Sequence, residues 1–154
     1  QFSDLYLRVD GIDLHRVALE LAHGRDPARL PRQAPSAGAA ASVVYREFDP
    51  RARPAMPSAA RREAMRERFP DSLLFVFPKS PGQIARDFKW LSSYRYGILH
   101  LGGHDAANLE ARCRAASDML GWRLPQAVPD PAMPDNVARD LAPLAPPLSL
   151  ETPR

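Results

Sequence analysis

Residues 93–101, Ser-Tyr-Arg-Tyr-Gly-Ile-Leu-His-Leu, together with the stretch that follows them, decide the fold. Their aromatic and aliphatic side chains predict a β-strand. Gly102-Gly103 is then expected to turn the chain, and Asp105 to cap a helix over residues 106–120. The apolar stripe of this helix comprises Leu109, Cys113, Ala116 and Leu120. Gly121 suits the position just past its end.

Two earlier stretches predict further strands. Residues 40–48 carry Val44, Arg46 and Phe48 on one face, and Asp49-Pro50 closes the stretch. Residues 72–77, Ser-Leu-Leu-Phe-Val-Phe, form a continuous apolar run, which favours a strand buried on both faces.

The rest of the chain predicts helices and connections. Residues 12–23 have the clearest helical pattern, with Asp13 as a candidate cap and Gly24 at the end. A short polar helix is expected at about 59–69. Residues 83–90 are ambiguous and could form a helical turn that packs Ile84, Phe88 and Trp90. The stretch before Gly11 is expected to be a sheet edge or a loop, and residues 25–37 a proline-rich connection.

This order of elements predicts an α+β fold, with a small, mostly antiparallel sheet backed by helices. Eight of the 17 prolines lie at or after Pro125. We therefore divide the chain into a compact region, residues 1–124, and a Pro-rich tail, residues 125–154, in which 135–142 could form a short helix.

Composition excludes several classes of function. The net charge is +3, and basic residues are mixed with acidic ones except between Arg51 and Arg68, where six arginines stand against few acids. A nucleic-acid-binding stripe is normally denser and carries aromatic residues, so no nucleic-acid partner is expected. Cys113 alone supports neither a disulfide framework nor a cysteine zinc site. No apolar segment is long enough to span a bilayer, so we expect no membrane partner and a cytoplasmic location.

Arg46 is the residue most open to a functional interpretation. An arginine on the apolar face of a strand is costly unless it pairs with an anion, which is either a structural salt-bridge partner or a substrate. His100 and His104 are separated by the Gly-Gly pair and lack further ligands in sequence, so no metal site is expected. The Gly-Gly passage before the helix could bind an anion, although a plain tight turn is the simpler interpretation.

Three stretches, in this order, resemble the C-terminal portion of ATP-grasp enzymes, closest to carbamoyl-phosphate synthetase large chains and biotin carboxylases. The first comprises Gln1, Gly11-Ile12-Asp13-Leu14 and Leu21-Ala22-His23-Gly24-Arg25. The second is Ala41 to Pro50, which resembles a returning strand that ends in an acidic residue and proline. The third is Tyr94 to Leu120, which resembles the closing strand, turn and helix of that family.

The resemblance implies that the parent protein is a ligase that uses ATP and Mg²⁺ to convert a carboxylate to an acyl phosphate, which an amine or related nucleophile attacks. The nucleotide-binding half would lie before Gln1, so this fragment is expected to need that N-terminal part, to be inactive alone and to bind neither ATP nor Mg²⁺ tightly. Gln1 is implied to line the substrate site. Arg46 is implied to be the catalytic arginine, although its distance from the Asp-Pro end differs by two residues from the family pattern.

A second hypothesis is a non-catalytic protein-interaction or dimerisation module. The apolar run 72–77, Phe88, Trp90 and the Pro-rich tail would then contact a partner or a second copy in a homodimer.

Overall fold

The structure is a computed structural model that describes residues 2–125. Three antiparallel strands form one sheet in the order β1-β3-β2, where β1 is Ala39–Glu47, β2 is Leu73–Val76 and β3 is Tyr94–Gly103. The central strand, β3, is buried along most of its length. The α+β class and the antiparallel sheet predicted from the sequence are confirmed.

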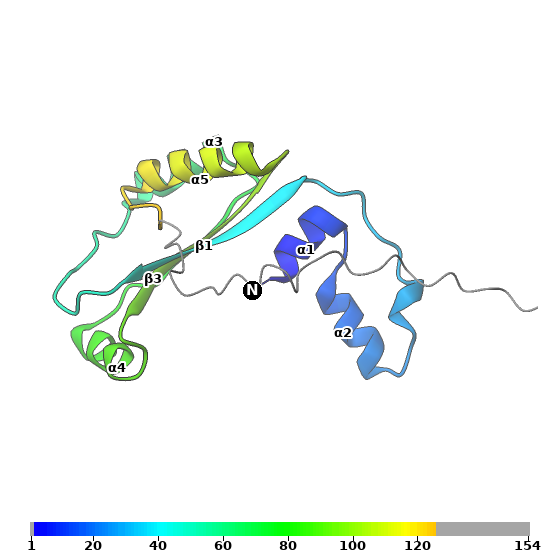
Figure 1. Ribbon diagram of the computed structural model, residues 1–154, viewed down its shortest axis with the longest axis horizontal. Coiled ribbons are helices and arrows are strands. Elements are labelled where there is room, and N and C mark those ends of the chain that lie inside the picture. Colours follow the sequence, from blue (N-terminus) through cyan, green and yellow to red (C-terminus); the bar gives the residue numbers. More distant parts are fainter. Residues whose placement is uncertain (1, 126–154) are drawn as a thin grey trace, which may run out of the picture.

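Helices surround this sheet on two sides (Figure 1). The helical segments are α1 (Ser3–Asp10), α2 (Leu14–Ala22), the 3-10 turn η1 (Pro27–Arg29), α3 (Ala59–Arg68), α4 (Pro81–Leu91) and α5 (Ala106–Leu120). Helices α3 and α5 lie together over one face of the sheet, whereas α1 lies on the other side and α4 near the far end of the strands.

The main hydrophobic core lies between the sheet and the pair α3 and α5. Tyr45, Leu99 and Leu101 of the sheet are fully buried there. They pack with Met65 of α3, with Cys113, Ala116 and Leu120 of α5, and with Trp122. The Tyr45 hydroxyl lies 2.7 Å from Ser117 Oγ, which in turn donates to the Cys113 carbonyl at 2.7 Å.

The pairing of β1 with β3 contains a bulge. Tyr45 is opposite Gly97, while Arg46 is opposite Arg95, so Tyr96 is the extra residue. Tyr96 therefore turns toward the core, where its ring lies 5.3 Å from that of Trp122. The bulge places Tyr94, Tyr96 and Gly97 together on the core side, where Tyr96 and Gly97 lie next to the Trp122 ring.

Residues 3–10 form a helix rather than the sheet edge or loop expected from the sequence. The helix is favoured by an ion pair one turn apart, between Asp4 and Arg8 at 2.7 Å. Gly11 ends it with φ 67°, a left-handed conformation that glycine adopts readily. Backbone bonds from Ser36 and Ala37 to the Arg8 carbonyl fasten α1 to the segment that leads into β1.

Gly102-Gly103 does not form the predicted turn, because β3 continues through both residues. A Cβ atom at Gly103 would lie 2.7 Å from the Leu109 backbone nitrogen, and one at Gly102 would lie 2.9 Å from Ala37 Cβ. The two glycines therefore allow α5 and the segment before β1 to approach the end of the strand closely.

The run 72–77 is not the fully buried strand that its continuous hydrophobicity predicted. Its strand, β2, lies at an edge of the sheet, and Leu73 and Phe75 are 41% and 44% exposed. Leu74 and Val76 alone turn toward the core.

The ambiguous stretch 83–90 belongs to α4, which begins with a capping box between Ser80 and Gln83. Ile84 is buried and Phe88 packs on Tyr94, but Trp90 is 74% exposed rather than packed.

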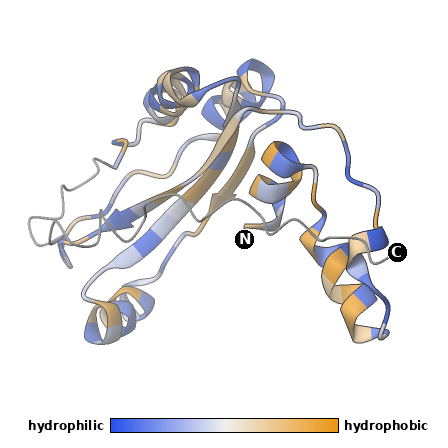
Figure 2. Ribbon diagram, turned by 45° about the vertical axis from the view of Figure 1, so that its right-hand side comes forward, coloured by the Kyte–Doolittle hydropathy of each residue, from blue (hydrophilic) through white to orange (hydrophobic). Residues whose placement is uncertain are grey.

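Helix α2 has the predicted cap, because the Asp13 carboxylate accepts from the backbone of His15 and Arg16. Figure 2 shows apolar positions along α2, but none of its residues is buried, and Leu19 and Leu21 are exposed. The possible helix at 135–142 and almost all of the Pro-rich tail lie outside the described residues. Within residues 2–125, no helix combines the length and the apolar character needed to cross a bilayer.

Candidate functional site

The sheet face turned away from α5 is the candidate functional surface, and we call it the open face. Side chains alternate along a strand, so residues paired in register share a face. The register places the following side chains on the open face: Ser42, Val44, Arg46, Leu73, Phe75, Arg95, Ile98 and His100. Helix α1 covers the His100 end of this face, and α4 lies near the Arg46 end.

Arg46 is held by a neutral partner. Its Nε and one terminal nitrogen donate to Ser93 Oγ at 3.2 and 2.9 Å. Ser93 is buried and donates its own hydroxyl proton to the Leu91 carbonyl at 3.1 Å. No ion pair within residues 2–125 includes Arg46, so the structural salt bridge weighed for this residue is not formed there.

Arg95 lies directly opposite Arg46 on the neighbouring strand, and we call the two residues the arginine pair. The Arg95 guanidinium stacks over the Phe77 ring, 4.9 Å from its centroid, and also has no carboxylate partner among the described residues. Like charges at opposed positions of a sheet destabilise it. Two unneutralised, partly buried guanidinium groups are therefore suited to bind an anionic group between them.

One acidic group close enough to be affected by the charge of Arg46 already has a partner. Asp87 of α4 pairs with Lys79 at 2.8 Å. Its pKa is held below the usual value chiefly by the hydrogen bond from Lys79, with a smaller contribution from the charge of Arg46. The Asp87 carboxylate is thus committed to Lys79, and the arginine pair keeps its capacity for an external anion.

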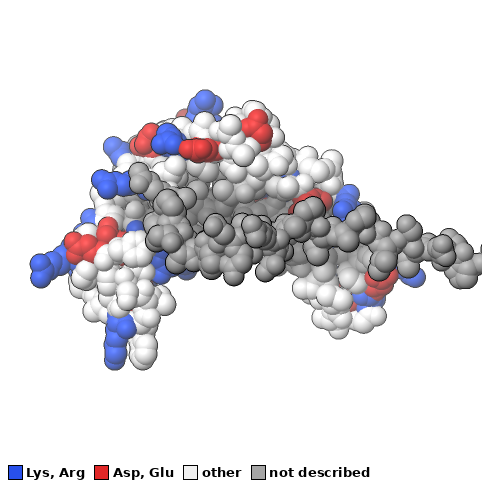
Figure 3. All heavy atoms as spheres, viewed as in Figure 1, with Lys and Arg blue, Asp and Glu red and all other residues white. Residues whose placement is uncertain are grey.

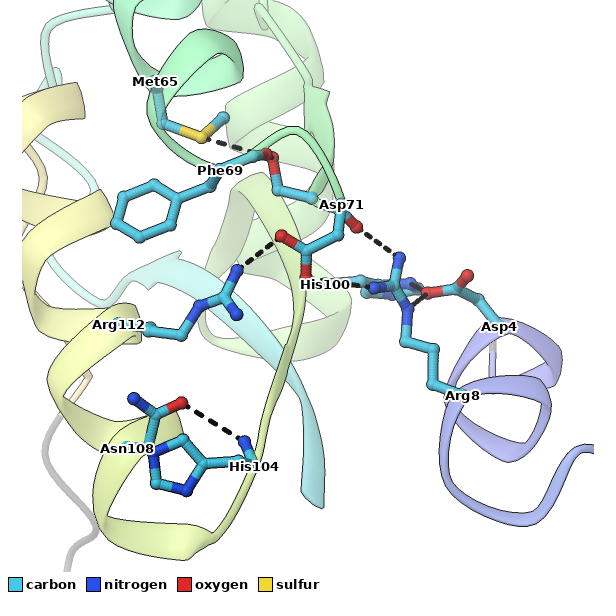
Figure 4. A network of polar contacts seen from close by, with 10 residues as sticks. Asp4, Arg8, Met65, Phe69, Asp71, His100, His104, Asn108 and Arg112 are labelled. Atoms are coloured by element: carbon cyan, nitrogen blue, oxygen red, sulfur yellow. Dashed lines mark hydrogen bonds and ion pairs between the residues drawn. The ribbon is translucent and has the colours of Figure 1, made fainter. Parts of the chain in front are cut away.

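The other end of the open face carries a polar network (Figure 4). Arg8 of α1 contacts Asp4 at 2.7 Å and Asp71 at 3.4 Å. The second carboxylate oxygen of Asp71 accepts from Arg112 of α5. Asp71, in the turn before β2, therefore connects helices that lie on opposite sides of the sheet.

His100 lies under this network and is almost completely buried. Its Nδ1 is 3.5 Å from Asp4 Oδ2, and neither ring nitrogen has a hydrogen-bond partner among the described residues. Burial lowers the pKa of His100, and the charge of Asp4 offsets part of that effect. The neutral imidazole is thus the favoured form, and its ring packs edge-on against Phe75.

The other residues considered as site residues in the sequence analysis are not brought together within the described part of the chain. Gln1, the predicted substrate-binding residue, lies outside the described residues. His104 is exposed and contacts Asp105 rather than His100. Within residues 2–125, no three His, Cys, Asp or Glu side chains gather as metal ligands.

Sequence reasoning found Arg46 but missed Ser93 and Arg95. The signal for Arg95 was present in Tyr94-Arg95-Tyr96, where an arginine interrupts an aromatic strand just as Arg46 interrupts β1. Placing the two arginines opposite each other requires the bulge at Tyr96, which no local pattern in the sequence indicates.

Comparisons with known proteins give no relative: no family model, no curated protein and no solved structure matches this chain.

Proposed function

We propose that this chain is the C-terminal part of an ATP-grasp ligase that joins a carboxylate to an amine or related nucleophile through an acyl phosphate. The observation that carries the proposal is the arginine pair, two guanidinium groups on an otherwise largely apolar strand face with no carboxylate partner among residues 2–125. The resemblance of the three stretches to ATP-grasp enzymes supports the same conclusion and supplies the reaction class.

In this proposal ATP, bound with Mg²⁺ by the missing N-terminal part, supplies the phosphoryl group that activates the carboxylate. The Mg²⁺ ligands would lie in that N-terminal part, and the protein would act in the cytoplasm. Gln1 would contact the substrate.

Arg46 and Arg95 would hold the anionic oxygens of the substrate and offset the negative charge that develops during transfer. Ser93 would fix the Arg46 guanidinium in one orientation, because it accepts from two of its nitrogens. Preorganised donors of this kind contribute more than mobile ones, since no reorganisation is needed when charge develops.

The test uses the parent protein that includes the sequence preceding Gln1. We expect ADP release that requires both a carboxylate and an amine, and a loss of about 10²-fold in kcat/KM for Arg46→Ala. Arg114→Ala is the matched control, because Arg114 is exposed on α5 and, among residues 2–125, pairs only with Glu110. ADP release that ignores the carboxylate, or an upstream sequence without an acidic residue followed by Asn-x-Arg, would contradict the proposal.

The second candidate, an interaction or homodimerisation module, is favoured by a different observation. Leu73, Phe75, Trp90 and Leu91 are large apolar side chains between 41% and 74% exposed. Sedimentation velocity of the chain tests it: a dimer weakened by Phe75→Ser and Trp90→Ser supports the module, whereas a monomer at all concentrations counts against it.

A further inference from the structure

A groove runs between α3 and the outer edge of β2, and the ligase proposal does not use it. It encloses about 580 Å³, with Arg62 and Arg66 of α3 among its charged residues and Leu74 and Val76 of β2 on its other wall. Met65, which is buried in the core, closes its base.

The edge of β2 that faces this groove has unpaired backbone groups. The Phe77 backbone nitrogen donates to the Tyr96 carbonyl at 3.0 Å, which makes Phe77 and Tyr96 a hydrogen-bonded pair. In an antiparallel ladder such pairs alternate, so Phe75 and Leu73 also turn their backbone groups toward β3. The N–H and C=O groups of Leu74 and Val76 therefore point outward, on the side where the described part of the chain has no further strand.

Positive charges outnumber negative charges beside the groove. Helix α3 carries four arginines and two glutamates and belongs to the arginine-rich stretch Arg51–Arg68. Glu63 is neutralised by Arg66. Arg62 has no ion-pair partner among residues 2–125, so it is the cation left for a ligand in the groove.

We propose that this groove binds an extended acidic peptide segment of another protein, which adds to β2 as a fourth, outer strand. The peptide backbone bonds to Leu74 and Val76, as in other cases where a strand is added to an exposed edge. Alternate apolar side chains of the peptide enter the groove above Met65, and its acidic side chains pair with Arg62.

A second copy of this chain fits the groove less well than an acidic peptide does. Pairing β2 with β2 would bring two arginine-rich α3 helices to the same interface, with like charges facing each other. The groove also combines apolar walls with polar ones, as expected of a peptide site with alternating contacts. This inference is independent of the ligase proposal, since it uses neither Arg46 nor Arg95.

The probe is a fluorescein-labelled peptide, acetyl-Glu-Val-Glu-Val-Glu-Val-amide, titrated with the chain of residues 1–154 and followed by fluorescence anisotropy. We expect saturable binding that is about tenfold or more tighter than that of the peptide with Lys in place of Glu, equivalent to roughly 1.4 kcal/mol. Arg62→Glu should weaken binding by about the same factor, because it replaces attraction with repulsion. Arg114→Glu, an exposed charge on α5, is the matched control and should leave binding unchanged.

Val76→Pro tests the backbone contact, because proline removes an outward N–H and is tolerated at a sheet edge. We expect Val76→Pro to lose binding of the peptide even when its circular dichroism spectrum matches that of the unsubstituted chain. Arg62→Glu keeps the test decisive should Val76→Pro not fold. The proposal would be overturned by any of three results. The Glu and Lys peptides could bind equally well, Arg62→Glu and Arg114→Glu could have equal effects, or the chain could form a concentration-dependent dimer that occupies β2.

Discussion

The guanidinium of Arg46 is fixed by the hydroxyl of Ser93, at 3.2 Å from Nε and 2.9 Å from a terminal nitrogen. The contact joins β1 to the residue that precedes β3 and involves no carboxylate. Elsewhere, on the face seen in Figure 3, charges of both signs lie beside one another.

Ser93→Ala is therefore predicted to weaken anion binding without removing a charge. Inorganic phosphate, added to the chain, should shift the Nε–Hε resonance of Arg46, and Ser93→Ala should raise the apparent dissociation constant by roughly three- to tenfold. Without the Ser93 hydroxyl the Arg46 guanidinium is no longer held in one orientation, so phosphate binding has to restrict its motion. The same resonance shift in Arg46 and in Arg114 would show nonspecific binding and contradict the prediction.

Gly97→Ala is predicted to destabilise the fold by about 1–3 kcal/mol, as overpacking of a core does. A Cβ at this position would lie 2.5 Å from the Trp122 ring, which is held by its Nε1 bond to the Ala55 carbonyl at 2.9 Å. Chemical denaturation measures the loss. Gly82→Ala is the control: no atom lies within 4 Å of its Cβ, and we expect a gain of about 0.5–1 kcal/mol in the first turn of α4.

His100 is predicted to make stability depend on pH. Its folded pKa lies below the ordinary value of 6.5, so the unfolded chain binds the proton more readily. The contribution of neutral His100 is complete above pH 6.5 and is lost as the pH falls from there through the lowered folded pKa. Melting temperatures between pH 8 and 5 should show this loss.

His100→Leu should reduce the slope of melting temperature between pH 7 and 5, and it should not destabilise the protein at pH 7, because both ring nitrogens are unpartnered within residues 2–125. His15→Leu is the comparison, since His15 is exposed on α2. A slope left unchanged by His100→Leu would show that other groups cause the acid sensitivity.

Tyr45→Phe is predicted to cost about 1 kcal/mol, the typical value of one buried hydrogen bond. The Ser117 hydroxyl still donates to the Cys113 carbonyl in this variant, so it loses only its hydrogen bond with the Tyr45 hydroxyl. Burial raises the pKa of Tyr45 to about 12. Because this folded pKa lies above the ordinary value of 10.0, the contribution is present below pH 10 and is lost as the pH rises toward 12.

Absorbance at 295 nm measures the titration of the four tyrosines. In the unsubstituted chain the last tyrosine to ionise should do so near pH 12, and Tyr45→Phe should remove that step. Persistence of the step would assign it to another tyrosine.

The sequence predicted the parts of the fold that depend on local patterns. Helix α5 follows from its apolar stripe, its Asp105 cap and Gly121, whose φ is 72°. It did not predict α1, because an eight-residue helix with no buried side chain has too weak a pattern and depends on its tertiary contacts. It misjudged β2 because a continuous apolar run indicates burial on both faces, whereas Leu73 and Phe75 sit at an open edge.

For the candidate site, the sequence could single out Arg46 as an unexpected charge on a strand. It could not show Ser93 beside Arg46, since 47 positions separate them along the chain. Nor could it pair Arg46 with Arg95, because that register depends on one extra residue in β3.

Asp71 links helix α1 to helix α5. Its carboxylate accepts from Arg8 on α1 and from Arg112 on α5, two helices with the sheet between them. Helix α1 has no buried residue of its own, so this ion bridge adds to the backbone bonds that fasten the helix to the rest of the fold. Exchange of the α1 amide hydrogens with solvent should then follow global unfolding, and Asp71→Asn should convert it to exchange by local opening of that helix alone.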